Sequence, residues 1–179
     1  MFFDIEENIR RKARTPHELS MFNLMFFHLL LWAGALVLVL TKAQLVEQIG
    51  NWGFVLPLIA SLSVIAFIHI RALRADAHDH WFIASHWRLA RKRTLILLSG
   101  YAVTGLVLAL AFFASSGSSV GNIMFAAFTR VSVVPTLLAV MVSFVLESGS
   151  IYQAGRGEVP DGTAKRFPPP ADIKAVERP

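Results

Sequence analysis

Long apolar runs separated by short polar segments dominate this chain. Four windows of about 20 residues are almost free of charge, and a helix of that length crosses a hydrocarbon core of about 30 Å. The windows cover residues 21–40, 52–70, 94–113 and 123–146. The pattern predicts an all-α, polytopic membrane protein with four transmembrane helices arranged as two hairpins.

The polar segments divide the chain into three parts. Residues 1–20 form an N-terminal segment, residues 21–148 hold the four-helix domain, and residues 149–179 form a tail rich in Pro and Gly. This composition predicts an extended tail. Thr15, followed by Pro16 and three positions later by Glu18, is typical of a helix start. We therefore expect the first helix to begin near Thr15.

The distribution of cations predicts the orientation in the membrane. Of 17 Lys and Arg residues, four lie in the N-terminal segment, six in the connector between the second and third windows, and five in the tail. Cationic segments stay on the cytoplasmic side of a membrane. Both termini and the connector are thus expected in the cytoplasm, with the helices in a bacterial inner membrane. Anionic lipid head groups, rather than nucleic acid, are the expected partners of these cations.

Composition also excludes several classes of chemistry. Only 16% of the residues are charged and 55% are hydrophobic, against about 25% charged residues in soluble domains. There is no cysteine, which rules out disulfides and thiol catalysis. The chain also lacks a phosphate-binding loop, a dinucleotide fingerprint, a zinc-protease motif and a nucleophile elbow.

Small residues predict how the last two windows pack. In membranes, helices approach each other closely along stripes of small side chains. The third window carries Gly100, Gly105 and Ala109, and the fourth carries Ser132, Thr136, Ala139 and Ser143 on one helical face. We expect these two stripes to face each other.

Two histidines in neighbouring windows suggest a cofactor. His28 and His69 lie at similar depths in the first and second windows, and two neutral imidazoles on facing helices can ligate a b-type haem. An imidazole in the hydrocarbon region is a functional-site hypothesis by default. The alternative is that both histidines are interfacial or hydrogen-bonded, without a cofactor.

The connector itself is rich in polar and aromatic side chains. Its Asp76, His78, Asp79, His80 and His86 have the chemistry of a mononuclear metal site, but a solvated loop is the stronger expectation, so no metal is predicted. The aromatic and basic residues expected to contact lipid head groups or a partner are Trp81, Trp87, Arg88, Arg91, Lys92 and Arg93.

Arg130 is a charge near the start of the fourth window. Such a charge is costly inside lipid. Either the span begins near Val131 and residues 123–129 form a re-entrant or interfacial piece, or Arg130 extends to the surface. As a further alternative, it binds an anion, a quinone or a partner's carboxylate.

These observations favour a non-catalytic structural or accessory subunit of a membrane complex or homo-oligomer, and no cofactor is expected. The alternative is an electron-transfer subunit that holds haem between His28 and His69. A second alternative is an oligomeric channel or transporter. Its pore would have to form between copies, because the four windows contain no acidic residue to guide a cation.

Overall fold

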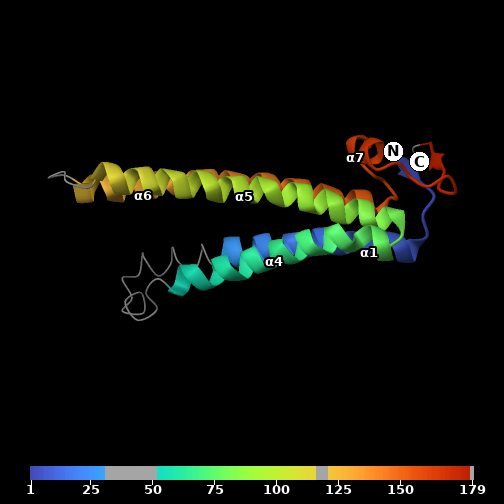
Figure 1. Cartoon of the computed structure of the whole chain (residues 1–179), viewed down its shortest axis with the longest axis horizontal. Coiled ribbons are helices and arrows are strands. Elements are labelled where there is room, and N and C mark those ends of the chain that lie inside the picture. Colours follow the sequence, from blue (N-terminus) through green and yellow to red (C-terminus); the bar gives the residue numbers. More distant parts are fainter. Residues whose placement is uncertain (31–51, 116–120, 178–179) are drawn as a thin grey trace.

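A computed structural model describes residues 1–30, 52–115 and 121–177 of the chain. Five α-helices and one π-helix account for most of these residues (Figure 1). In chain order the elements are β1 (Phe2–Phe3), α1 (Glu7–Phe22), the π-helix η1 (Asn23–Leu30), α4 (Trp52–His78), α5 (Trp81–Ser115), α6 (Gly121–Gly155), α7 (Asp161–Arg166) and β2 (Ala175–Val176). The prediction of an all-α protein is confirmed.

Three of the described helices are long and apolar enough to cross a membrane. The candidate spans are Val55–Ala75 in α4, Trp81–Ser115 in α5 and Val131–Gly155 in α6. They match the second, third and fourth predicted windows. The first window begins at the end of α1 and continues through η1, and its residues 31–40 lie outside the described part of the chain.

The helices run back and forth between two ends of an elongated bundle (Figure 1). α1 and η1 leave the end where both termini lie, α4 returns to that end, α5 leaves it again and α6 returns beside α5. Antiparallel pairing of β1 with β2 joins the two ends of the chain, with Phe2 opposite Val176. Below, the end of the bundle that carries β1, β2 and α7 is called the terminal end.

The tight packing of α5 on α6 confirms the main part of the small-residue prediction. A Cβ on Gly100 would lie 2.5 Å from the Cβ of Ala139, so only glycine fits at this crossing. Thr104 Oγ1 lies 2.7 Å from Thr136 Oγ1 and donates to the Ser132 carbonyl at 2.7 Å. The stripe on α6 is buried throughout.

Two residues of the predicted α5 stripe lie elsewhere. No described atom lies within 4 Å of a Cβ built on Gly105, and Gly105 and Ala109 are exposed. Five positions separate Gly100 from Gly105, which is well over one helical turn of 3.6 residues. Gly105 therefore points away from the face that meets α6.

Helix α1 starts earlier than its sequence pattern indicates. It begins at Glu7, and Pro16 lies inside it, so the prediction of a helix start at Thr15 is wrong. Proline in a helix interior removes one backbone hydrogen bond, but Pro16 is buried here together with Ala13, His17 and Ser20. The packing of this stripe against α5 and α6 outweighs the local preference.

The connector between the second and third windows is mostly helical. α4 continues to His78 and α5 begins at Trp81, leaving Asp79 and His80 as the break. His80 Nδ1 accepts a hydrogen bond from the backbone N–H of Phe82 at 3.2 Å, which caps the start of α5. Arg71 forms an ion pair with Asp79 at 2.6 Å across the turn. The expected solvated loop is thus a compact turn.

The tail is also more ordered than its composition predicts. α6 continues to Gly155, α7 follows at Asp161, and β2 returns the chain to β1. Trp81 Nε1 donates to the Phe167 carbonyl at 3.0 Å, and the Arg88 guanidinium lies 3.9 Å from the centre of the Phe167 ring. These contacts fix the tail over the first turns of α5.

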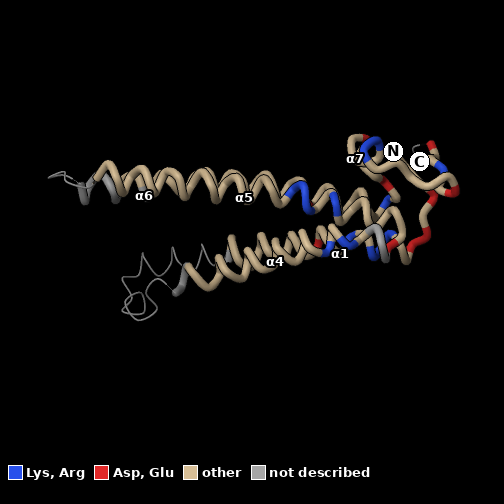
Figure 2. Tube along the Cα trace, in the orientation of Figure 1, with Lys and Arg blue, Asp and Glu red and all other residues tan. Residues whose placement is uncertain are grey.

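Charge is concentrated towards the terminal end of the bundle. Figure 2 shows Lys and Arg residues in α1, in the first turns of α5 and around α7. Within the described residues, the apolar windows are only 17% to 33% buried. Much of their surface therefore requires an apolar environment.

Candidate functional site

Three side chains from three helices form a buried hydrogen-bonded chain near the terminal end. His17 on α1 lies between Glu147 on α6 and His86 on α5. Its Nδ1 is 2.5 Å from Glu147 Oε2, and its Nε2 is 3.0 Å from His86 Nδ1. The exposed fractions are 0% for both histidines and 1% for the glutamate. We call these residues the Glu147–His17–His86 chain.

Helix periodicity brings the three residues together. His17 lies on the stripe of α1 that also buries Ala13, Pro16 and Ser20, a spacing that places all four on one face. His86 packs edge-to-face on His17, with ring centres 5.2 Å apart, and is 4.8 Å from the ring centre of Phe82. The two imidazoles are therefore fixed in orientation by neighbours on their own helices and across the interface.

Arg93 supplies the positive charge beside this chain. Its guanidinium donates to the Leu146 carbonyl and to Ser150 Oγ on α6. Glu147 lies between these two acceptors in the sequence, and the charges of Arg93 and Glu147 interact. A buried carboxylate is costly unless a cation or hydrogen-bond donors compensate it, and Arg93 with His17 provides both.

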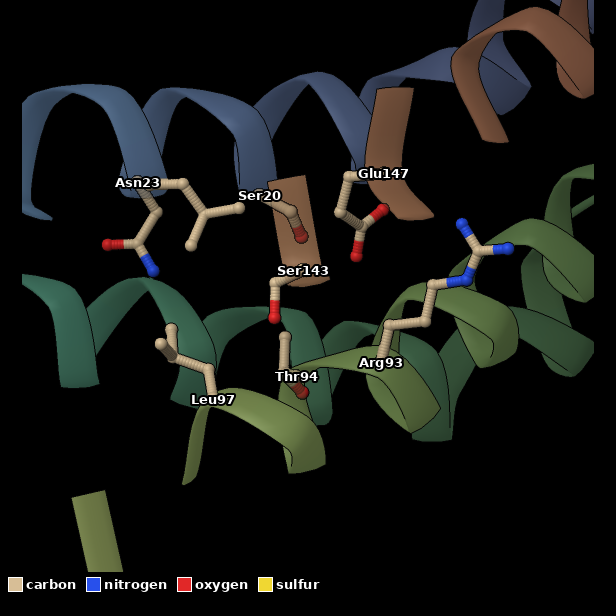
Figure 3. Close-up of a pocket in the computed structure, with 8 residues that line it drawn as sticks. Ser20, Asn23, Arg93, Thr94, Leu97, Ser143 and Glu147 are labelled. Carbon is tan, nitrogen blue, oxygen red and sulfur yellow. The ribbon is translucent and has the colours of Figure 1, made fainter. Parts of the chain in front are cut away.

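A small polar cavity adjoins Glu147. Its lining residues are Ser20, Asn23, Leu24, Arg93, Thr94, Leu97, Ser143 and Glu147 (Figure 3). The volume open to the centre of a water molecule is about 10 Å³, which is close to the minimum volume needed to hold one water. Ser20 Oγ, Asn23 Oδ1 and Ser143 Oγ are buried here without a hydrogen-bond partner in the described part of the chain.

The protonation of His17 follows from its surroundings. Burial, and to a lesser extent the nearby Arg93 guanidinium, lowers the pKa of His17 from its ordinary value of 6.5 to about 3. His17 is therefore neutral at pH 7, and its contact with Glu147 is a hydrogen bond rather than an ion pair. A neutral imidazole has one donor and one acceptor nitrogen, so the chain has a direction set by which nitrogen carries the hydrogen.

The opposite end of the chain is unsatisfied. His86 Nε2 is buried and makes no hydrogen bond of good geometry in the described residues, although the Glu158 backbone is close enough to interact with the ring as a hydrogen-bond partner. Orphaned buried polar atoms are uncommon in folded proteins and indicate strain, a catalytic role or a bound water. Unused hydrogen-bonding capacity thus lies on His86 Nε2 at one end, and on oxygens that line the cavity beside Glu147 at the other.

Sequence reasoning missed most of this site. His17 falls in the N-terminal segment, Glu147 directly follows the fourth apolar window, and His86 falls in the expected loop. One available signal is the spacing of His17, Ser20, Leu24 and His28 at intervals of three, four and four positions, with Asn23 next to Leu24. All five residues are buried in the structure, so the polar positions of this stripe mark its inner face.

The two predicted haem ligands have separate partners. His28 is buried, its Nε2 hydrogen-bonds the Tyr101 hydroxyl, and its Nδ1 lies 3.1 Å from the Asn23 carbonyl. His69 Nδ1 lies 3.0 Å from the Ile65 carbonyl of its own helix. Ligation of iron through His28 would require the loss of one of these contacts, and haem binding stays a prediction.

The predicted lipid-contacting group is divided between the interior and the surface. Trp87 is buried and faces the Arg71 guanidinium at 5.3 Å, and Arg93 belongs to the site described above. Trp81 packs edge-to-face on Phe3, with ring centres 5.0 Å apart, while Arg88 faces Phe167. Arg91 and Lys92 are exposed, and contact with head groups stays a prediction for them.

The remaining candidates do not converge on one site. Asp79 pairs with Arg71, His80 caps α5 and His86 turns towards His17. In the searched, described residues no three acidic or histidine side chains are grouped as metal ligands. Arg130 lies within α6, which is continuous from Gly121. The candidate span begins at Val131, as the first alternative expects. Residues 123–129 continue the same helix, so they are not a separate re-entrant piece, and an interfacial position stays a prediction for them. The Arg130 side chain lies outside what the structure describes.

Comparisons with known proteins add no relative. No family model matches the chain, and neither the curated proteins nor the solved structures include a significant match. Function must therefore be argued from the fold and the site.

Proposed function

We propose that this protein is a multi-pass membrane protein that acts as a non-catalytic structural or accessory subunit, either of a larger membrane complex or of a homo-oligomer. The observation that carries this proposal is an exposed stripe of small residues on α5, which we call the groove. Ala102, Gly105 and Ala109 lie three and four positions apart on the exposed side of that helix. No described atom approaches a Cβ placed on Gly105 within 4 Å.

Small side chains at such spacing allow another helix to approach closely. The same chemistry already operates inside the protein, where Gly100 permits the contact between α5 and α6. Lipid tails gain nothing from a glycine on the helix surface, and glycine costs about 1 kcal/mol in a helix interior relative to alanine. A second helix that packs on Gly105 compensates this cost, and that supports a partner rather than lipid alone.

The arrangement of charge supports the orientation. α5 is 35 residues long, about 50 Å at 1.5 Å per residue, and therefore exceeds a hydrocarbon core of about 30 Å. We propose that its first turns, from Trp81 to Arg93, lie in the cytoplasm with both termini. Arg91 and Lys92 then meet anionic head groups at the inner surface.

A single cysteine can test association because the native chain has none. In membranes, Ala109→Cys should form an intermolecular disulfide if copies meet along this groove. Adding Gly105→Leu should abolish the crosslink by filling the groove. Val103→Leu is the matched control because Val103 is also exposed on α5 but two positions away, which places it on a different helix face.

If the crosslink is absent from membranes and native-membrane purification yields a monomer without any co-purifying membrane protein, the proposal is wrong. If the crosslink is absent but Gly105→Leu releases a co-purifying subunit, the partner is another protein. An absorption spectrum after expression with ample haem tests the alternative electron-transfer function. A haem band that is lost in both His28→Ala and His69→Ala would replace our proposal.

A further inference from the structure

We propose that the Glu147–His17–His86 chain is a proton relay that connects a water bound in the polar cavity with the terminal end of the bundle. This inference goes beyond the structural role proposed above and does not depend on it. It rests on the geometry of three buried side chains, on the cavity at one end of the chain, and on the unsatisfied nitrogen at the other end.

The chain has two complete hydrogen-bonding arrangements. In the first, Glu147 is ionised and accepts from His17 Nδ1–H, while His17 Nε2 accepts from His86 Nδ1–H. In the second, Glu147 is protonated and donates to His17 Nδ1, and His17 Nε2–H donates to His86 Nδ1. The heavy-atom distances of 2.5 Å and 3.0 Å place both pairs within hydrogen-bonding reach, whichever atom carries the hydrogen.

One proton converts the first arrangement into the second. A proton binds at His86 Nε2, and the His86 Nδ1 proton moves to His17 Nε2. The His17 Nδ1 proton then moves to Glu147 Oε2. Both imidazoles end neutral with their hydrogen on Nε2, so one proton has entered at His86 and one has been bound by Glu147. Both histidines thus transfer the proton and are neutral before and after the transfer.

The cavity provides the exit for this proton. Glu147, Ser20 and Ser143 line it, and the serine hydroxyls are buried without a partner in the described residues. Figure 3 shows these side chains around one common space, with Arg93 extending from α5 beside Glu147. A water there can accept the proton from the Glu147 acid and hydrogen-bond the hydroxyls, because a buried water typically makes about three hydrogen bonds.

Water fits this space better than a metal cation. The hydroxyl, amide and carboxylate oxygens would suit Na⁺, but Arg93 also lines the cavity, and two positive charges at such short range repel each other in a medium of low dielectric constant.

The charged and titratable groups at and around the relay come from four helices and the tail. α1 contributes His17, α5 contributes His86 and Arg93, and α6 contributes Glu147. On α4, Arg71 faces Trp87 and pairs with Asp79 instead. From the tail, the Glu158 backbone lies beside His86. Arg93 is thus the cation whose charge interacts with Glu147.

The experiment follows histidine tautomers and the Glu147 carboxyl in the full-length protein in lipid vesicles. Nitrogen-15 NMR of labelled imidazoles distinguishes Nδ1–H from Nε2–H, and His17→Gln and His86→Gln assign the signals. Infrared spectra report the carboxylic acid as a C=O band that Glu147→Gln removes. Both spectra are recorded between about pH 4 and pH 9, a range that includes the ordinary pKa values of Glu and His side chains.

We expect both histidines to change from Nδ1–H to Nε2–H at the pH at which the Glu147 acid band appears. Glu147→Gln should abolish this change, whereas His69→Gln, outside the chain, should keep it. The idea is overturned if Glu147 gains its proton while the two tautomers stay fixed, or if the histidines become charged independently. The wild-type coupling alone decides the question should Glu147→Gln fail to fold.

A second arm identifies the occupant of the cavity. The titration is repeated with Na⁺ replaced by a bulky organic cation at constant ionic strength. An unchanged titration supports water as the carrier. A midpoint that moves with Na⁺ concentration would show a bound cation and would overturn the proposed exit.

Discussion

Glu147 Oε2 lies 2.5 Å from His17 Nδ1, although 130 positions separate the two residues. This contact joins the first helix to the last long one, and Arg93 joins the same place to α5 through Leu146 and Ser150. The polar cluster is thus the point at which three helices are held together. Its residues are expected to matter for stability whether or not a proton moves through them.

Removal of the Glu147 carboxylate should destabilise the fold strongly. Glu147→Ala removes the buried partner of His17 and the negative charge near the half-buried Arg93. A buried polar group that loses its partner costs about 1–3 kcal/mol. Glu147→Gln should cost less because the amide keeps a hydrogen bond to His17. Reversible unfolding in mixed micelles measures both. Glu18→Gln, at an exposed position of α1, is the control and should be neutral. Equal stability of Glu147→Ala and the native protein would contradict this account.

The neutral state of His17 predicts a loss of stability at acidic pH. The pKa of His17 is about 3 when folded and 6.5 ordinarily, so between these values the unfolded chain binds a proton that the folded chain excludes. Stability from this residue is therefore complete above pH 6.5, falls as the pH decreases, and levels off below about pH 3. The full loss amounts to about 5 kcal/mol as an upper limit.

The measurement is the free energy of unfolding against pH for the native chain and for His17→Gln. Glutamine cannot be protonated in this range, so its curve should be flatter between pH 6.5 and about 3. His69→Gln serves as a control that retains the native slope. Parallel curves for the native chain and His17→Gln would mean that His17 is charged in the folded protein.

The contact between α5 and α6 predicts opposite results at two glycines of one helix. Gly100→Leu should separate the helices, because even its Cβ would lie 2.5 Å from Ala139 Cβ, and overpacking typically costs about 1–3 kcal/mol. Gly105→Leu should leave the monomer at least as stable, since its Cβ meets no described atom within 4 Å. Thermal unfolding in detergent compares them. A similar loss in both variants would refute the helix contact described here.

Gly157 should be essential for the joining of the two termini. It has a φ of 73°, its carbonyl accepts from the Phe3 N–H at 3.0 Å, and a Cβ would lie 2.6 Å from the Phe3 carbonyl oxygen. The left-handed conformation alone costs an L-residue about 1–2 kcal/mol. Gly157→Ala should therefore release the N-terminal segment and speed its proteolysis. Gly162→Ala, at an open position of α7, is the control and should be cleaved by the protease at the native rate.

The spans were predictable because the bilayer imposes a length and an apolar composition that any sequence must satisfy. The close approach of α5 to α6 was also predictable in part. Gly100 and the small residues of α6, which recur at three to four positions, are apparent in the sequence. The same spacing could not show that Gly105 points away. Small residues mark a contact surface, but not which neighbour occupies it.

The polar cluster was not predictable because its three helices meet through contacts between residues 69 and 130 positions apart. Periodicity describes one helix at a time and contains no information on which faces meet. Glu147 also follows directly on the fourth window, where a charge ordinarily marks the end of a span. The early start of α1 could not be predicted for the same reason. The residues around Pro16 indicate a helix start, but the packing of this buried stripe against other helices allows the helix to begin at Glu7.

The pairing of β1 with β2 affects the order in which parts of the protein can fold. His17 leaves the ribosome well before Glu147, and at about 5–20 residues per second the interval is on the order of ten seconds. His17 has neither partner until His86 is made 69 positions later, it lacks Glu147 to the end of the interval, and β1 is made longer still before β2. Completion of the bundle is therefore a late step that follows synthesis of α6 and the tail, and a truncated nascent chain cannot reach it.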